Sequence, residues 1–178
     1  DDIKNHIANN AKGKISPFTV LSMPNLNNKD YLSVATNWSQ QKKIKSFVKI
    51  NTPIKNKLTI GYLSADFRNH PLYYLILDIL KNHNNKTFTI KLFYSGPDES
   101  SMEHEAFKKL DYPFINLSSE NDAASAQIIR DEEVDVLVDL SGFTQNSRSL
   151  MAAYKPARFH INWLGFPGTM GFHHKKPL

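Results

Sequence analysis

From residue 58 onward, short apolar segments that suit β-strands alternate with segments of helical periodicity. Strands are expected at 58–63, 88–94, 114–117, 134–140 and 159–164. The segments between them predict helices that begin at Pro71 and span 101–110, 121–130 and 149–154. Strands that alternate with helices of about ten residues form parallel sheets covered by helices. The sequence therefore predicts an α/β fold with a doubly wound, mostly parallel sheet.

The helix expected after the first strand carries an apolar stripe. Pro71 suits its first turn, because proline lacks an N–H group and the first-turn N–H groups are unpaired anyway. Five residues recur at the spacing of one helical face, namely Leu72, Leu75, Ile76, Ile79 and Leu80. We expect this stripe to pack on the sheet.

Residues 1–57 are expected to form a partly helical arm. A weakly amphipathic stretch covers 3–11, and helical spacing predicts a helix from Asn28 to Gln41. The arm holds ten Lys/Arg and three Asp/Glu, whereas residues 58–178 hold twelve and fourteen. Its lysines are scattered and form no recognition motif, which favours a solvated surface over a nucleic-acid site. We therefore expect no nucleic-acid partner.

Composition excludes several kinds of site. The chain has no cysteine, so disulfides and thiolate metal sites are excluded. It has no apolar run of the roughly 18 residues that a membrane span needs, and no secretory signal pattern. We therefore expect a cytoplasmic protein with no membrane partner. The pair His173-His174 has no carboxylate cluster beside it, so no metal site is expected.

The loop after the first strand, residues 63–71 (LSADFRNHP), is a candidate site. Ligands of open α/β sheets bind beyond the carboxyl ends of the strands. His70 comes just before the expected helix, whose dipole disfavours the imidazolium, so we expect a neutral ring that can accept a proton. The N–H groups of the helix start could also receive a phosphate. Alternatively, Asn69 or His70 only caps the helix.

A second loop, residues 163–169 (WLGFPGT), follows the last expected strand, and 139–144 (DLSGFT) is a third. Glycines around Pro167 permit close backbone approach and unusual φ angles, and Thr169 offers a hydroxyl. Such a turn could hold a diphosphate or a sugar, or be only a tight connection. The sequence has neither G-x-G-x-x-G nor G-x-x-x-x-G-K-[ST], which argues against a dinucleotide dehydrogenase and a P-loop NTPase.

Three segments together resemble the O-GlcNAc transferase/SPINDLY glycosyltransferase family, glycosyltransferase family 41, and its bacterial members most. They are residues 58–71 (LTIGYLSADFRNHP), 136–144 (VLVDLSGFT) and 156–171 (PARFHINWLGFPGTMG), in the family's order and spacing. The resemblance implies one Rossmann-like half of a GT-B enzyme that transfers a sugar with inversion. The donor it implies is UDP-GlcNAc, or GDP-fucose in the SPINDLY branch, and the acceptor is a Ser or Thr hydroxyl of a protein; a related branch glycosylates asparagine.

The resemblance also assigns site residues. His70 would lie at the active site and has been considered as a general base, and its neighbours Asn69 and Pro71 would help to bind the substrate or donor. Pro167, Gly168 and Thr169 would lie beside the donor. The nucleotide sugar is a co-substrate, and no metal is expected. Where animal members carry an Asp and a His near the site, this chain has Gln127 and Arg130, so that pair is not carried over.

The resemblance divides the chain into three parts. Residues 1–57 would follow tetratricopeptide repeats, 58–171 would form the N-terminal half of the catalytic region, and 172–178 do not match the family. The second catalytic half, which supplies most nucleotide contacts, is not in the sequence. We therefore expect a fragment of a glycosyltransferase with negligible turnover by itself. The alternative is a non-catalytic α/β module that binds a partner protein or peptide.

Overall fold

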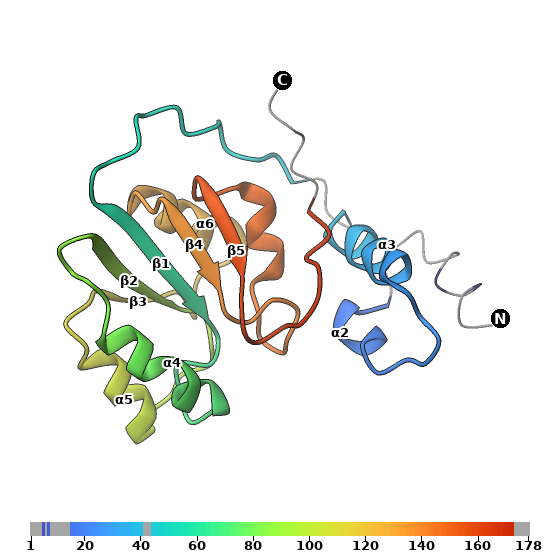
Figure 1. The fold of residues 1–178 in the computed structure, drawn as a ribbon, viewed down its shortest axis with the longest axis horizontal. Helices are drawn as coiled ribbons and strands as arrows, with labels where there is room; N and C mark the ends of the chain where they lie inside the picture. Colours follow the sequence, from blue (N-terminus) through green and yellow to red (C-terminus); the bar gives the residue numbers. More distant parts are fainter. Residues whose placement is uncertain (1–4, 6, 8–14, 41–43, 173–178) are drawn as a thin grey trace.

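A parallel sheet forms the centre of the structure (Figure 1). The computed structural model describes residues 5, 7, 15–40 and 44–172. Within these residues the strands are β1 (Leu58–Ser64), β2 (Phe88–Tyr94), β3 (Phe114–Asn116), β4 (Val136–Asp139) and β5 (Phe159–Asn162). They lie in the order β3-β2-β1-β4-β5, and each neighbouring pair is parallel. The predicted doubly wound α/β fold is confirmed.

Helices cover both faces of the sheet (Figure 1). They are α4 (Pro71–Lys81), α5 (Met102–Lys108), α6 (Asp122–Asp131) and the 3-10 helix η1 (Ser149–Tyr154). Apolar side chains of α4 and α5 pack in one core cluster with Tyr62 and Leu92. Those of α6 and η1 pack in a second cluster with Leu63 and Phe93. Because neighbouring residues of a strand point to opposite faces, these clusters lie on opposite sides of the sheet.

The apolar stripe of α4 is only partly buried. Leu72, Ile76 and Leu80 face the core, whereas Leu75 is 58% exposed and Ile79 is 42% exposed. Helix α5 lies next to α4, and the two helices touch where the ring of Tyr73 meets that of Phe107 edge-on. The prediction that the whole stripe packs on the sheet was therefore wrong at Leu75 and Ile79, since the sheet contacts only one line of residues.

A row of apolar side chains on β5 is also exposed. Phe159 and Ile161 are two residues apart on the strand, so their side chains point to the same face of the sheet. Trp163 follows two residues later and is also exposed. The register pairs Phe159 with Val136 and Ile161 with Val138, and both valines belong to the face that α4 and α5 cover. On this face, none of the helices in the described part of the chain buries the β5 row.

The arm packs on the loops at the end of the sheet. Its helices are α2 (Pro17–Val20) and α3 (Asn28–Ser39), and Ala35 of α3 is buried beside Phe143 and Phe166. Ser39 Oγ donates to Met170 O at 2.7 Å.

Some sequence expectations fall elsewhere in the chain. Apart from residues 5, 7 and 172, the stretch 3–11, His173-His174 and the segment 172–178 lie outside the described residues. Over the described residues, each helix is too short or too polar to cross a membrane.

Candidate functional site

The three candidate loops leave the carboxyl edge of the sheet, after β1, β4 and β5 (Figure 1). The strand order reverses at β1, because β2 and β3 lie on one side of it while β4 and β5 lie on the other. In doubly wound sheets the ligand-binding crevice lies at such a switch point. The space outside the ends of β1 and β4 is therefore the candidate site.

Hydrogen bonds join the β1 loop to the β4 loop. Ala65 N donates to Ser141 Oγ at 3.2 Å, and the hydroxyls of Ser64 and Ser141 lie 3.4 Å apart. Ser64 Oγ also accepts from Asp66 N at 2.9 Å. All of these groups are buried, so the bonds hold the two strand ends together without competition from water.

A buried carboxylate shapes the β4 loop. Asp139 Oδ1 accepts from the N–H groups of Ser141 and Gly142, both at 2.9 Å. Gly142 has φ +58°, and a Cβ there would lie 2.4 Å from Phe166 Cβ. Glycine is therefore required for both its conformation and its close approach to the β5 loop.

His70 is the N-cap of α4, and its Nδ1 accepts from Leu72 N at 3.2 Å. An N–H group can only donate, so the neutral ring carries its own proton on Nε2. In this arrangement Nδ1 already accepts the cap hydrogen bond from Leu72 N, so it can take up a proton only if that bond breaks, and the expected proton-accepting role stays a prediction. His70 instead presents a hydrogen-bond donor at Nε2.

The start of α4 is already paired in its first turn. Pro71 has no N–H, Leu72 N donates to His70 Nδ1, and Tyr73 N donates to His70 O at 2.9 Å. The expectation that these N–H groups receive a phosphate is therefore wrong at these positions. Pro71 and the neighbouring Asn69 are both exposed.

The β5 loop is held by close backbone contact. A Cβ at Gly165 would lie 2.1 Å from Leu140 O. Asn162 Nδ2 donates to Phe166 O at 2.9 Å and to Gly168 O at 3.3 Å. The expected close approach is found, but the left-handed φ of +69° belongs to Leu164 and not to a glycine around Pro167.

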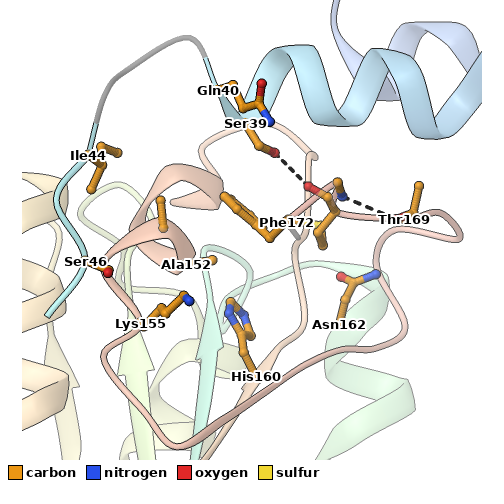
Figure 2. A pocket seen from close by; sticks show the side chains of 13 residues that line it. Ser39, Gln40, Ile44, Ser46, Ala152, Lys155, His160, Asn162, Thr169 and Phe172 are labelled. Atoms are coloured by element: carbon orange, nitrogen blue, oxygen red, sulfur yellow. Dashed lines mark hydrogen bonds between the residues drawn. The ribbon is translucent and has the colours of Figure 1, made fainter. Parts of the chain in front are cut away.

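The three residues expected beside the donor are exposed on this loop. Pro167, Gly168 and Thr169 all lie at the surface, and Thr169 Oγ1 accepts from Gly171 N at 3.2 Å. Thr169 also lines a cavity of about 350 Å³ between the end of α3, η1 and β5 (Figure 2). Ser39, Lys155, His160 and Asn162 are among its polar lining residues.

The structure thus brings the candidate loops to one edge but not into one cavity. His70, Asn69 and Pro71 do not line the cavity that contains Thr169. The β4 loop lies between them, since Ser141 contacts the β1 loop and Leu140 contacts Gly165. A shared site of His70 and Thr169 stays a prediction. Across the described ranges, His, Asp and Glu form no group of three that could hold a metal ion.

Two residues at the start of α5 that sequence reasoning did not single out also hold the β1 loop. Asn69 N donates to Ser101 Oγ at 3.2 Å, and His104 Nδ1 lies 2.6 Å from Phe67 O. Ser101 is the N-cap of α5 and His104 lies in its first turn. A serine such as Ser101 suits an N-cap position, but it does not indicate what the helix start contacts.

The fold and the paired loops at its switch point define a Rossmann-like α/β domain of the kind that binds ligands at its carboxyl edge. The family model described as glycosyl transferase family 41 matches residues 32–176. The chain belongs to this family.

Two curated relatives each match about two thirds of the chain. A probable UDP-N-acetylglucosamine–peptide N-acetylglucosaminyltransferase, SEC of Arabidopsis thaliana, is 30% identical over 115 residues, which is 65% of this chain and 12% of the relative. The Caenorhabditis elegans UDP-N-acetylglucosamine–peptide N-acetylglucosaminyltransferase is 27% identical over 116 residues, or 65% of this chain and 10% of the relative. The chain therefore spans only about a tenth of the length of these relatives.

A solved structure supports the fold. An O-GlcNAc transferase mutant of Thermobaculum terrenum matches with a TM-score of 0.77 at 20% identity. The match covers 87% of this chain and 30% of that chain.

Proposed function

We propose that the protein containing this sequence transfers N-acetylglucosamine from UDP-GlcNAc to Ser or Thr hydroxyls of acceptor proteins, with inversion and in the cytoplasm. Membership of family 41, together with the segment Asn69-His70-Pro71 at the switch point, carries this proposal. The relatives that match this chain have names that specify the same donor and a peptide acceptor. The nucleotide sugar is a co-substrate, and the resemblance implies no metal cofactor.

In the proposed reaction the acceptor oxygen bonds to the anomeric carbon of the sugar. The bond from that carbon to the phosphate oxygen breaks, its electron pair leaves with UDP, and the hydroxyl proton passes to a base. His70 Nδ1 could serve as that base only by releasing Leu72 N–H, which costs about 1 kcal/mol of capping energy. We therefore assign His70 Nε2–H as a donor to an oxygen of the donor sugar or its phosphate, and at the phosphate this role stabilises the negative charge that develops as UDP leaves.

The experiment compares His70→Asn with His70→Ala in the longest open reading frame that contains this sequence. Asn is a good N-cap, so His70→Asn keeps the helix start while removing the imidazole. Loss of one charge-stabilising donor lowers turnover by about 100-fold, so we expect His70→Asn to lower transfer from UDP-GlcNAc by this factor with unchanged thermal stability. Unchanged transfer would contradict the assignment. Assays with GDP-fucose and UDP-glucose identify the donor.

The alternative is a non-catalytic module that binds a partner protein, and the exposed row of Phe159, Ile161 and Trp163 favours it. A module of this kind predicts no transfer by the full-length protein from any nucleotide sugar. It also predicts that Ile161→Asp abolishes partner binding while His70→Asn does not. The chain of residues 1–178 by itself is expected to have negligible turnover under either function, and turnover at an ordinary enzyme rate would contradict this.

A further inference from the structure

We propose that His104 is a positioning residue, whose buried ring fixes the peptide segment just before His70. The inference rests on the proposed function only for its effect on transfer. Its effect on the loop itself follows from contacts in the described chain.

The ring of His104 is buried between two strands and the β1 loop. It is 6% exposed, and its Nδ1 lies 2.6 Å from Phe67 O. A carbonyl oxygen can only accept, so Nδ1 carries the proton of the neutral ring. The ring also meets Tyr94 and Phe114 edge-on, with centroids 4.8 Å and 5.3 Å away. His104 therefore has a single orientation and a defined tautomer.

The carbonyl that His104 pairs belongs to a buried residue. Phe67 is fully buried, and its ring packs on Phe107 of α5 at 4.8 Å. Water cannot replace a donor at a buried carbonyl of this kind, so loss of the His104 N–H leaves an unpaired acceptor. The segment is expected to move in order to regain a partner.

A second contact from the same helix start lies two residues further along. Ser101 Oγ accepts from Asn69 N at 3.2 Å and from His104 N at 3.3 Å. The Glu99 carboxylate in turn accepts from Ser101 N, and this backbone hydrogen bond holds the pKa of Glu99 below its usual value. The start of α5 therefore pairs both Phe67 O and Asn69 N, and His70 is the next residue.

His83 provides a matched control at the opposite edge of the sheet. Its Nε2 lies 2.9 Å from Tyr62 Oη, and its ring also packs on two aromatic rings, those of Tyr62 and Phe88. It follows α4 and precedes β2, so it lies at the amino edge. Replacing either histidine by Phe keeps an aromatic ring and removes one hydrogen bond, but only His104→Phe affects the β1 loop.

The first test measures the chain in solution by NMR. Long-range ¹H–¹⁵N spectra are expected to show the neutral His104 ring protonated on Nδ1 and the neutral His70 ring protonated on Nε2. Loss of one net hydrogen bond changes an equilibrium constant, here that of local opening, by about tenfold. His104→Phe is therefore expected to speed amide exchange of Asn69 and Leu72 by about this factor. His83→Phe should leave both unchanged. His104→Asn, whose amide can replace Nδ1–H, should restore slow exchange.

The second test measures transfer by the full-length protein. His104→Phe is expected to lower kcat by about tenfold with little change in the donor KM, because the His70 donor is misplaced in the transition state. His104→Asn should recover most of kcat, and His83→Phe should match the unaltered protein.

Several results would overturn the proposal. They are a neutral His104 ring protonated on Nε2, equal effects of His104→Phe and His83→Phe, and faster loop exchange with unchanged kcat. The tautomer is measured on the unaltered chain, so this result does not depend on whether a variant folds. If the unaltered full-length protein transfers no sugar, the proposed function fails, and the tautomer and exchange data still decide whether His104 fixes the loop.

Discussion

The β1 loop and the β5 loop leave the same edge of the sheet, but different contacts hold them. Residues 64–67 of the β1 loop are buried, and side chains of two other segments pair with its backbone, namely Ser141, Ser101 and His104. The β5 loop is mostly exposed, and the side chain of Asn162 pairs with its backbone at Phe166 and Gly168. Each loop also involves a close glycine contact, Gly96 with Ala65 O and Gly165 with Leu140 O.

The difference separates two ways of building a strand-end loop. In the β1 loop, several hydrogen bonds from distant parts of the chain hold the segment that carries the His70 imidazole. Each bond therefore supplies only part of the stability of this loop. In the β5 loop, the tight Gly165 contact fixes the path, while Pro167, Gly168 and Thr169 stay open to solvent. One loop presents a chemical group in a fixed orientation, and the other presents an accessible surface.

The largest effect is expected where the β5 loop has no room. In Gly165→Ala, the new Cβ would lie 2.1 Å from Leu140 O, and backbone atoms must shift. Overpacking of this kind lowers the free energy of unfolding by about 3 kcal/mol, measurable by urea denaturation. Gly168→Ala is the control, because its Cβ would meet side-chain atoms of the Phe166 ring and no backbone atom. Equal losses for the two variants would contradict the close contact.

The next effect tests the hydrogen bonds of the β1 loop. Ser141→Ala leaves the buried Ala65 N–H without its acceptor and is expected to lower the free energy of unfolding by about 2 kcal/mol. Ser95→Ala is the matched control, because Ser95 is buried and its Oγ has no hydrogen-bond partner. The control should be neutral or slightly stabilising. A similar loss in both variants would show that cavity formation, and not the unpaired donor, sets the cost.

A smaller effect on stability is expected at the end of β2, next to the β1 loop. Tyr94 Oη donates to Pro97 O at 2.6 Å, and Tyr94→Phe is expected to lower the free energy of unfolding by about 1 kcal/mol. Burial raises the pKa of Tyr94 from 10.0 to about 12. The unfolded chain therefore ionises this phenol first, and stability falls as the pH rises through this interval. Tyr94→Phe should make that fall shallower, as measured by denaturation as the pH rises from 10.0 to about 12; an unchanged slope would contradict the raised pKa.

The smallest effect on stability is expected at the exposed surface of the β5 loop. Thr169→Val removes an acceptor for Gly171 N, and such surface changes stay within about 0.5 kcal/mol. Under the proposed function, the same variant raises the donor KM of the full-length protein severalfold. Thr144→Val on the β4 loop is the comparison. An unchanged donor KM in Thr169→Val would remove Thr169 from the donor site.

Local sequence patterns predicted the order of the elements well. The strand expected at 58–63 is found as β1, and Pro71 marks the start of α4 as expected. The same patterns failed on the burial of α4, because nearly every residue of that helix is apolar. Periodicity then cannot distinguish Ile76, which contacts the sheet, from Leu75, which does not.

The candidate site was predicted as three separate loops, and their contacts could not be predicted. Ser141 meets Ala65 across 76 positions of sequence, and this depends on the register of β1 and β4. His104 pairs with Phe67 across 37 positions, through the packing of α5 beside the β1 loop. A single histidine in an expected helix gives no signal of this contact. The tautomer of His70 likewise depends on the cap that it forms.

The central position of β1 has a consequence for how the molecule is made. The register pairs Ile60 of β1 with Val136 of β4, so one of the two neighbours of β1 comes from a part of the chain far from it in sequence. Closing so long a loop costs entropy before pairing repays it, and high contact order of this kind slows folding. During synthesis, Ser141 is added long after Ser64. We therefore expect the edge that carries His70 to reach its final form late, so that nascent chains ending before Val136 are cleaved by protease within the β1 loop.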